Sequence, residues 1–352
     1  MEFKELFANY KKTIKEKLLE TIDLKKADYE KRFGENDEFF TIFKNFTVSG
    51  KMIRGSLFLL SCESNGYKID DSLLSIACSL ELMHSALLIH DDIMDNDELR
   101  RGEKTIFTKY KEIAIDRNIK NPEHYGLSMG IVTGDIALFM AEELVSNYEK
   151  ANLKKVLEFY TQELRFVGIG QMLDFRYGAE EREVSAYEIE RMYIYKSARY
   201  TFSLPLAMGA IAAGKNDDFI KKIEKLGETI GLIFQLVDDD IGIFGDEEEI
   251  GKPIGSDIKE NKKTLMRSLL INKIDDEKKD LVEEIFGKQN ITEGEIEIIR
   301  NLLIESGTRE DIKVKINDLY KESEKIIASL DLTSEYKKVY LDLLEYNTKR
   351  IY

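Results

Sequence analysis

The chain of 352 residues has few of the residues that would divide it into domains or cross-link it. Only three prolines and two cysteines are present, and no Pro-rich or Ser/Gly-rich stretch is typical of a linker. The sequence therefore predicts a single domain, residues 1–352, large enough to bury a sizeable core. Cys62 and Cys78 form neither a disulfide framework nor a zinc-binding spacing, so we expect a reducing, cytoplasmic location.

Long apolar segments and an excess of positive charge are also lacking. No apolar run approaches the length of a membrane span, and the first residues lack the apolar core of a signal peptide, so no stable membrane anchor is expected. Acidic residues outnumber basic ones by 67 to 52, for a formal net charge of −15. This excess argues against nucleic acid as a partner, and an anionic ligand would need Arg and Lys concentrated in one cleft.

Apolar residues at helical spacing are abundant instead. Runs of helical length with apolar faces occupy residues 72–95, 127–147, 153–177, 187–213 and 218–244. Alternating strands bounded by turn signals are missing, so the sequence predicts an all-α fold. We expect a loop over the polar stretch 111–124, amphipathic helices from about residue 270 onward, and a kink at Pro205.

Two clusters of aspartate carry most of the chemical information. The first is Asp91-Asp92-Ile93-Met94-Asp95, and Arg100-Arg101 follows it. Asp91 and Asp95 lie four residues apart and share a helical face, where like charges cost about 0.2–0.5 kcal/mol per pair. A bound cation would offset this repulsion.

The second cluster is Asp238-Asp239-Asp240, and Lys252, Asp257 and Lys262 follow it. Carboxylates without cysteine or clustered histidine indicate Mg²⁺, which binds one or two carboxylates and completes its shell with substrate phosphate. The basic residues downstream would hold the same phosphates by charge-assisted hydrogen bonds. A single acidic run could be a solvated helix end, whereas two runs with matched basic partners favour a ligand site.

Five motifs in order, between about Gly50 and Thr264, resemble those of the trans-prenyltransferases, the polyprenyl diphosphate synthases. They are Gly50-Lys51-Met52-Ile53-Arg54, the two acidic clusters with their basic partners, Gly170-Gln171-Met172-Leu173-Asp174, and Tyr195-Lys196-Ser197. The resemblance implies a homodimer of all-helical chains, each with a deep apolar central cavity and both acidic motifs at its mouth. It also implies head-to-tail condensation, in which an allylic diphosphate ionises and isopentenyl diphosphate captures the carbocation.

The resemblance assigns a role to each matching residue. It implies that Mg²⁺ is bound by Asp91, Asp92, Asp95, Asp238 and Asp239. It implies that the allylic diphosphate contacts Arg100, Lys196 and Lys252, and that isopentenyl diphosphate contacts Lys51, Arg54, His84 and Arg101. Ser197, Gln235 and Lys262 complete the expected substrate site, and Lys196, Gln235 and Lys252 are the expected catalytic residues.

Three positions depart from the family pattern. Gly242 stands where a fuller second motif has a third aspartate, and Asp240 cannot replace it because two residues along a helix point to nearly opposite sides. Met52 replaces a commonly basic residue, and Gly55 replaces a proline. We therefore expect the isopentenyl diphosphate site to follow the family less closely than the allylic site.

Product length and two rival functions remain open at this point. The positions four and five before the first aspartate, where short-chain enzymes carry an aromatic, are Leu87 and Ala86. We therefore expect geranylgeranyl diphosphate or a longer product, with Leu82, Met83 and Phe139 as the next residues that could close the tunnel. A class I terpene cyclase would not need the isopentenyl diphosphate residues, and a non-catalytic prenyl-diphosphate-binding subunit would not need both acidic motifs.

Overall fold

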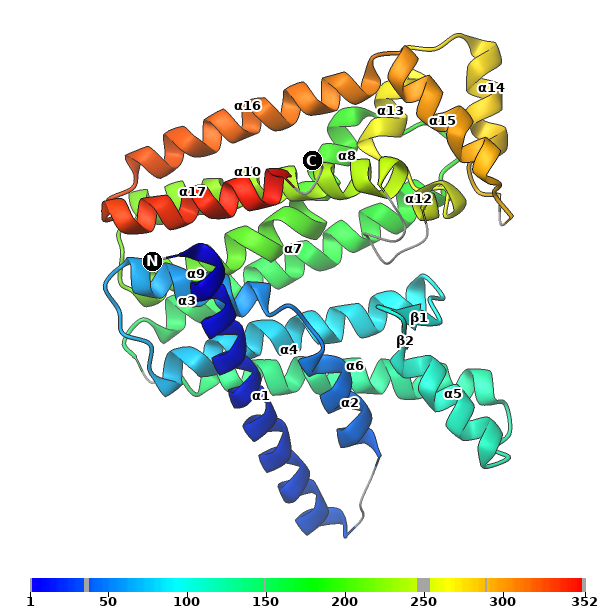
Figure 1. Cartoon of the computed structure of the whole chain (residues 1–352). Helices are drawn as coiled ribbons and strands as arrows, with labels where there is room; N and C mark the ends of the chain where they lie inside the picture. Colours follow the sequence, from blue (N-terminus) through cyan, green and yellow to red (C-terminus); the bar gives the residue numbers. More distant parts are fainter. Residues whose placement is uncertain (1, 35–37, 149, 246–253, 289, 350–352) are drawn as a thin grey trace. The chain divides into compact units, whose positions relative to one another are not determined.

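The computed structural model describes residues 2–34, 38–148, 150–245, 254–288 and 290–349. Regular structure in these residues is helical apart from one hairpin of two short strands (Figure 1). The predicted all-α fold is therefore confirmed. The chain forms two compact units, unit 1 with Met1–Leu157 and Ile211–Gly214, and unit 2 with Glu158–Ala210 and Lys215–Tyr352. The single domain and its central cavity stay predictions.

Unit 1 is built around one long buried helix, α4. Its elements are α1 (Phe3–Phe33), α2 (Phe39–Val48), α3 (Ile53–Ser64), α4 (Asp71–Met94), β1 (Leu99–Arg100), β2 (Glu103–Lys104), α5 (Ile106–Asp116) and α6 (Pro122–Ser146). Helix α4 packs against α3, α6 and α1, which together bury most of its length. The side chain of Asp70 caps its first turn by accepting a hydrogen bond of 2.9 Å from the Leu73 backbone N–H.

Helix α4 also corrects one expectation from the sequence. By length and composition alone, α4 is long and apolar enough to cross a membrane, and it is the one such helix among the described residues. The sequence interpretation that no run approaches a span is therefore wrong for α4. Because 67% of its most apolar window is buried inside the protein, its composition is that of a core helix.

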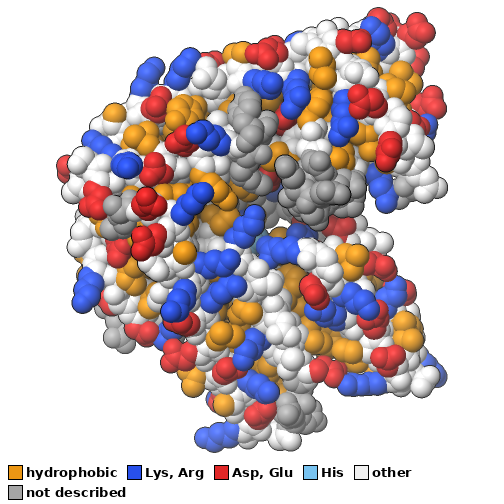
Figure 2. Space-filling view, viewed as in Figure 1, with side chains coloured by type: hydrophobic (Ala, Val, Ile, Leu, Met, Phe, Trp, Pro, Cys, Tyr) orange, Lys and Arg blue, Asp and Glu red, His pale blue; other side chains and the backbone are white. Residues whose placement is uncertain are grey.

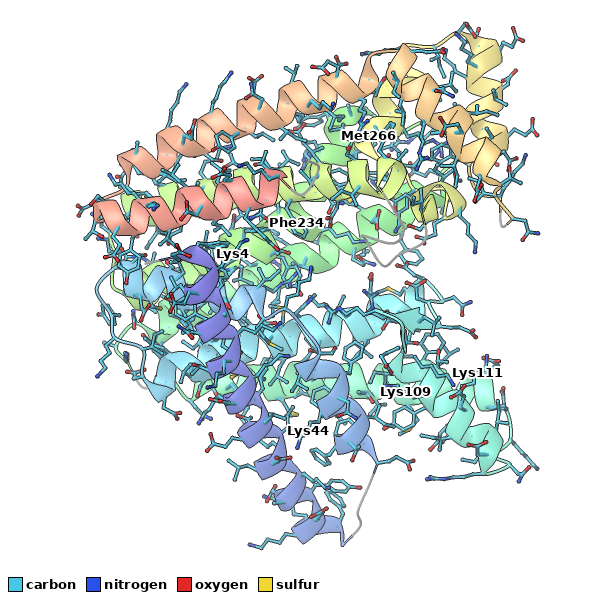
Figure 3. The ribbon with its side chains drawn as sticks, in the orientation of Figure 1. Lys4, Lys44, Lys109, Lys111, Phe234 and Met266 are labelled. Carbon is cyan, nitrogen blue, oxygen red and sulfur yellow. The ribbon has the colours of Figure 1, made fainter. Side chains whose placement is uncertain are left out.

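The predicted loop over residues 111–124 is largely helical. Helix α5 continues to Asp116 and α6 begins at Pro122, where a missing backbone N–H costs little because the first N–H groups of a helix have no partner within it. Lys111, labelled in Figure 3, lies on the polar side of α5 and pairs with Glu98 at 3.3 Å and Glu123 at 2.7 Å. The polar residues that indicated a loop form the outer face of a helix.

Unit 2 is organised around α10. Its elements are α7 (Leu153–Ala179, from Glu158 onward), α8 (Ala186–Tyr193), η1 (Ile194–Ser203), α9 (Leu204–Ala212, up to Ala210), α10 (Asp217–Phe244), α12 (Ser256–Lys259), α13 (Leu265–Ile271), α14 (Asp276–Ile285), α15 (Glu293–Glu305), α16 (Thr308–Ser329) and α17 (Ser334–Thr348). Helix α10 packs against η1, α16 and α17. The amphipathic helices expected after residue 270 are present.

The segment η1 is π-helical, so residues 187–213 do not form one continuous α-helix. Its last turn closes with the Leu204 N–H on the carbonyl of Arg199, and Pro205, which has no N–H to continue an α-helical ladder, follows directly. Gly227 and Gly231 bring α10 against η1, since a Cβ at either position would lie 2.4–2.5 Å from the Cα of Ser203 or Ala198. Phe202 packs on Phe234, labelled in Figure 3, with ring centroids 5.6 Å apart.

Both signs of charge are interspersed over the displayed face of the protein (Figure 2). Many acidic side chains pair with a basic neighbour, as in Asp70 with Lys150 and Glu188 with Arg182. On this face the acidic side chains are spread among basic ones, so local groups of charge matter more for ligand binding than the net charge of −15.

Candidate active site

The first acidic cluster lies at the C-terminal end of α4. The Asp92 side chain is 1% exposed, Asp91 is partly buried, and Asp95 is the exposed residue that ends the helix. The negative end of a helix dipole disfavours carboxylates, so this arrangement lowers the stability of the unliganded protein. Burial raises the pKa of Asp92 to about 6 even though the charge of Arg100 acts in the opposite direction.

Arg100 is the cation that compensates this cluster. Its guanidinium donates a hydrogen bond to Oδ1 of Asp92 and lies 3.6 Å from Asp91. The second oxygen of Asp92, Oδ2, is buried and has no hydrogen-bond partner among the described residues. A buried carboxylate oxygen without a donor is costly, and a cation would remove that cost.

The hairpin of β1 and β2 makes the side chains of Arg100 and Arg101 point in different directions. Strands β1 and β2 pair Arg100 with Glu103, and the turn between them is Arg101-Gly102, both with positive φ of 55° and 76°. A two-residue turn with both φ positive suits the twist of a hairpin, but the left-handed conformation costs a non-glycine residue about 1–2 kcal/mol. Arg101 is thereby directed to Ser49, with 3.4 Å between Nη1 and Oγ, while Arg100 points to α4.

The expected isopentenyl diphosphate residues form a second, basic group in unit 1. Arg54 in the first turn of α3 is buried, His84 on α4 is partly buried, and Lys51 is exposed. The pKa of His84 lies well below its ordinary value because of burial and the positive charges of Arg54 and Arg101. His84 is therefore a neutral hydrogen-bonding group in a cationic surrounding.

Gly55, which stands where the family pattern has a proline, makes a contact with Glu81 that a proline could not make. The buried carboxylate of Glu81 accepts the backbone N–H of Gly55 at 2.8 Å. A Cβ at Gly55 would also lie 2.9 Å from the carbonyl of Ala77. Met52 is 1% exposed in a left-handed conformation at the start of α3, so its side chain belongs to the core.

The second acidic cluster lies on α10 in unit 2. Asp239 is 4% exposed and both of its oxygens accept hydrogen bonds, Oδ1 from Gln235 at 2.9 Å and Oδ2 from the hydroxyl of Tyr193. Burial, and then the nearby charge of Asp257, raise the pKa of Asp239. Asp238, one residue earlier, is partly buried.

Asp240 points away from this group, as expected from its helical position. Its two oxygens each accept a hydrogen bond of 2.9 Å from Arg309 of α16, and Arg309 stacks on Phe244 with 3.7 Å to the ring centroid. Asp240 is therefore part of the contact between α10 and α16.

A pocket within unit 2 brings together Lys196, Ser197, Gln235 and Lys262 of the expected substrate site. Its lining consists of Asp174, Met192, Tyr193, Lys196, Ser197, Gln235, Asp239, Asp257, Lys262, Lys263 and Thr264. Lys196, at the first turns of η1, forms an ion pair with Asp174 of α7. The two segments approach closely at Gly170, where a Cβ would lie 2.6 Å from the backbone nitrogen of Lys196. Lys252 lies outside the described residues.

Two charged residues of this pocket had no assigned role. Asp257 on α12 places Oδ2 3.4 Å from where a Cβ on Gly242 would lie, so a carboxylate occupies the space beside the missing aspartate. Lys263 has a side chain that is only 5% exposed and shares Glu183 with Arg267, whereas the predicted Lys262 is 40% exposed and pairs with Asp257 and Glu260. The two consecutive lysines in Asn261-Lys262-Lys263 could have indicated Lys263 as a second candidate. Sequence spacing alone could not tell which of the two is buried.

The residues of each unit fit a divalent cation that is bound partly by carboxylates of the protein and partly by the phosphate groups of a bound substrate. Within the described part of the chain, no three or more carboxylate, histidine or cysteine side chains are arranged to bind an ion by themselves. Mg²⁺ commonly takes only one or two carboxylates and keeps its other positions for water and phosphate. Oδ2 of Asp92, which no described residue hydrogen-bonds, and the oriented carboxylate of Asp239 match that donor set.

The helical fold and the paired carboxylate and cation groups are compatible with an enzyme that binds diphosphates together with a metal ion. The polyprenyl synthetase family model matches residues 37–303. Geranylgeranyl diphosphate synthase of Saccharolobus solfataricus is 33% identical over 308 residues, covering 85% of this chain and 86% of that protein. The short chain isoprenyl diphosphate synthase of Methanocaldococcus jannaschii is 31% identical over 278 residues, covering 78% and 79% of the two chains.

A solved structure extends the likeness to the whole fold. The geranylgeranyl pyrophosphate synthase from Corynebacterium glutamicum, complexed with isoprenyl diphosphate and magnesium, has a TM-score of 0.90 at 27% identity and covers 97% of this chain and 98% of that chain. The chain therefore belongs to the polyprenyl synthetase family. It is a prenyltransferase that makes prenyl diphosphates.

Proposed function

We propose that this enzyme extends allylic diphosphates head-to-tail with isopentenyl diphosphate and makes geranylgeranyl diphosphate or a longer trans product. The observation that supports the proposal is the presence of two groups of basic side chains, one in each unit. Unit 1 has Arg54 and Arg101 around a neutral His84, and unit 2 has a pocket with Lys196, Lys262 and Lys263. Two such groups suit two diphosphate substrates, whereas a cyclase binds one.

In the proposed reaction each acidic motif would hold Mg²⁺ together with substrate. The residues are Asp91, Asp92 and Asp95 in unit 1, and Asp238 and Asp239 in unit 2, with Asp257 beside Gly242 as the further carboxylate. The bound metal would neutralise charge that develops on the departing diphosphate. The magnesium in the related C. glutamicum structure supports this choice of ion.

The basic residues would bind and orient the diphosphates. In unit 1, Arg100 would leave Asp92 for an allylic phosphate oxygen. In unit 2, Lys196, Ser197 and Gln235 would bind phosphate oxygens in their pocket. Lys252 and Lys262 keep their proposed roles as further cations. Lys51, Arg54, His84 and Arg101 would bind isopentenyl diphosphate, with neutral His84 acting as a hydrogen-bond donor. Binding both substrates in fixed positions supplies much of the rate enhancement available to a two-substrate reaction.

Product length would be set on α4, below the first acidic motif. Leu82, Met83 and Ala86 are fully buried, whereas Leu87 is partly exposed. Phe139 on α6 is 68% exposed, so within its own chain it does not close a tunnel. The absence of an aromatic at Leu87 supports a product at least as long as geranylgeranyl diphosphate.

We further propose a cytoplasmic homodimer without a stable membrane anchor. Exposed apolar side chains gather on α6, at Ile131, Val132 and Phe139, and separately on α7, at Ile169, Met172 and Phe175. Patches of this kind mark interaction surfaces, and a second copy would cover them. Sedimentation of purified protein at micromolar concentration should give the dimer mass, and a stable monomer would contradict the proposal.

One assay separates the proposed function from its rivals. Purified protein is incubated with Mg²⁺, labelled isopentenyl diphosphate and an allylic primer, and the products are sized. Geranylgeranyl diphosphate or a longer prenyl diphosphate is the expected result. A hydrocarbon formed from the allylic substrate alone would indicate a cyclase, and no turnover without a partner protein would indicate a non-catalytic subunit.

A further inference from the structure

The buried hydroxyl of Tyr193 in unit 2 connects the carboxylate of Asp239 with the first residue of α13. Tyr193 is the last residue of α8, and its side chain is 5% exposed. Its Oη contacts two groups, Oδ2 of Asp239 on α10 and the backbone nitrogen of Leu265 at 3.2 Å. Leu265 is the first residue of α13, directly after Lys262, Lys263 and Thr264 of the pocket.

The direction of these hydrogen bonds follows from the donors available. The Leu265 N–H can only donate, so Oη accepts from it. Against an ionised Asp239, the phenolic proton must then point to Oδ2. Because Gln235 donates to the other oxygen at 2.9 Å, both oxygens of Asp239 are fixed by uncharged donors, and their remaining lone pairs stay available.

We propose that Tyr193 is a positioning residue that holds Asp239 in its metal-binding orientation and couples it to the start of α13. The inference rests on the proposed function, in which Asp239 binds Mg²⁺ together with a diphosphate. Residues behind a metal ligand fix its orientation, and their loss typically costs about 10- to 100-fold in metal affinity or activity. A phenylalanine would keep the ring in its buried place and remove only the proton that Asp239 accepts.

The contact also connects the metal site with the pocket lysines. Thr264 caps α13 by accepting the Arg267 N–H at 3.3 Å, and Tyr193 accepts the N–H of the next residue, Leu265. Two of the otherwise unpaired N–H groups at the start of α13 are therefore satisfied, one of them by the residue that orients Asp239. An ion that keeps Asp239 ionised and in place should hold Tyr193 as its donor, and should therefore also restrain the Lys262–Thr264 segment.

The test compares Tyr193→Phe with Tyr187→Phe, a control on the same helix whose side chain is 70% exposed. Calorimetry with Mg²⁺ and inorganic diphosphate measures binding without requiring turnover. Tyr193→Phe should weaken this binding by about 10- to 100-fold, and should raise the Mg²⁺ concentration for half-maximal activity. KM for isopentenyl diphosphate should stay unchanged, because its proposed residues lie in unit 1. Unchanged Mg²⁺ binding and activation in a folded Tyr193→Phe protein would overturn the inference.

Hydrogen exchange in the wild-type protein provides a measurement that does not depend on the variant. Adding Mg²⁺ to protein with inorganic diphosphate should slow exchange at the Leu265 amide relative to diphosphate alone. An unchanged Leu265 rate while Mg²⁺ binds would overturn the coupling. If the wild type makes no condensation product, the proposed function fails; if it does so but Tyr193→Phe behaves as Tyr187→Phe, the inference alone fails.

Discussion

The two acidic motifs hold a buried aspartate in different ways. In unit 1, Asp92 is paired with a cation, Arg100, and its Oδ2 has no donor among the residues that the structure describes. In unit 2, Asp239 has both oxygens bound by the uncharged donors Gln235 and Tyr193. Burial raises the pKa of both carboxylates.

This difference indicates different tasks for the two units. Arg100 is itself a good phosphate ligand, so the pairing in unit 1 can be exchanged when a diphosphate arrives. Gln235 and Tyr193 carry no charge to transfer, so the arrangement in unit 2 is preorganised and stays in place. We therefore expect binding in unit 1 to involve a change of partner, and binding in unit 2 to use a preformed site.

The largest expected effect tests whether both motifs are needed. Asp92→Asn and Asp239→Asn should each lower turnover by about a hundred- to a thousandfold, the typical effect of removing one transition-state charge contact. Steady-state kinetics at saturating Mg²⁺ measure the effect, and circular dichroism checks the fold. Asp116→Asn, at an exposed position of α5, serves as the control. Near-normal turnover in either variant would remove that motif from the metal site.

A second effect concerns the adjacent arginines that the hairpin turns in different directions. Arg100→Ala should raise KM for the allylic substrate, and Arg101→Ala should raise KM for isopentenyl diphosphate. A charge-assisted contact contributes about 1.5–3 kcal/mol, so each change should be roughly ten- to a hundredfold. Lys104→Ala on the same hairpin is the control. Michaelis constants that rise together in both variants would show that the two arginines do not serve different substrates.

A third effect would locate control of product length in unit 1. Leu87→Phe should shorten the product, because a ring at a partly exposed position can enter the tunnel with little overpacking. Ala86→Phe, at a fully buried position, should instead cost about 1–3 kcal/mol of stability. Product chromatography and urea denaturation distinguish the two outcomes. An unchanged product from Leu87→Phe would place the tunnel floor elsewhere.

The smallest expected effect is the pH dependence that His84 gives to unit 1. Its folded-state pKa lies below the ordinary value, so the unfolded chain binds more protons as the pH falls below about 6.5. The free energy of unfolding should therefore decrease with falling pH in that range, by at most about 1.4 kcal/mol per pH unit from this group. Urea denaturation between about pH 5 and pH 7.5 should show a weaker dependence for His84→Gln. His124→Gln, at an exposed position, should match the wild type; an equal slope in all three proteins would exclude His84 as the source.

Many of the helices could be predicted from the sequence, because the spacing of apolar residues along a helix is a local property of the chain. The ranges 72–95 and 218–244 correspond closely to α4 and α10, since each buried face repeats along one helix. The predictions of secondary structure were wrong where polar composition was taken as evidence of a loop, or where composition gave no sign of a change in helix type. Residues 111–116 carry the charges of a loop but lie on the outer face of α5, and 187–213 contains a π-helical segment that its composition does not indicate.

The candidate site divides in the same way. Motif spacing identified the aspartates and the basic residues, and it excluded Asp240, whose partner proves to be Arg309. It gave no role to Tyr193 or Asp257, because a tyrosine between helices and a carboxylate on a short helix have no distinctive spacing. Their roles depend on distances to Asp239 and Gly242 that only the folded chain defines.

The sequence by itself determined the all-α class, the two carboxylate clusters and the family of the enzyme, because each depends on residue types at fixed separations along the chain. Only the tertiary structure decided which donor holds each carboxylate. Arg100 reaches Asp92 because a two-residue turn redirects the chain. Tyr193, the last residue of α8, reaches Asp239 directly before η1, the segment that glycines let approach α10. Hydrogen bonds form over about 3 Å, and their partners come from segments whose separation in the sequence does not predict their distance in space.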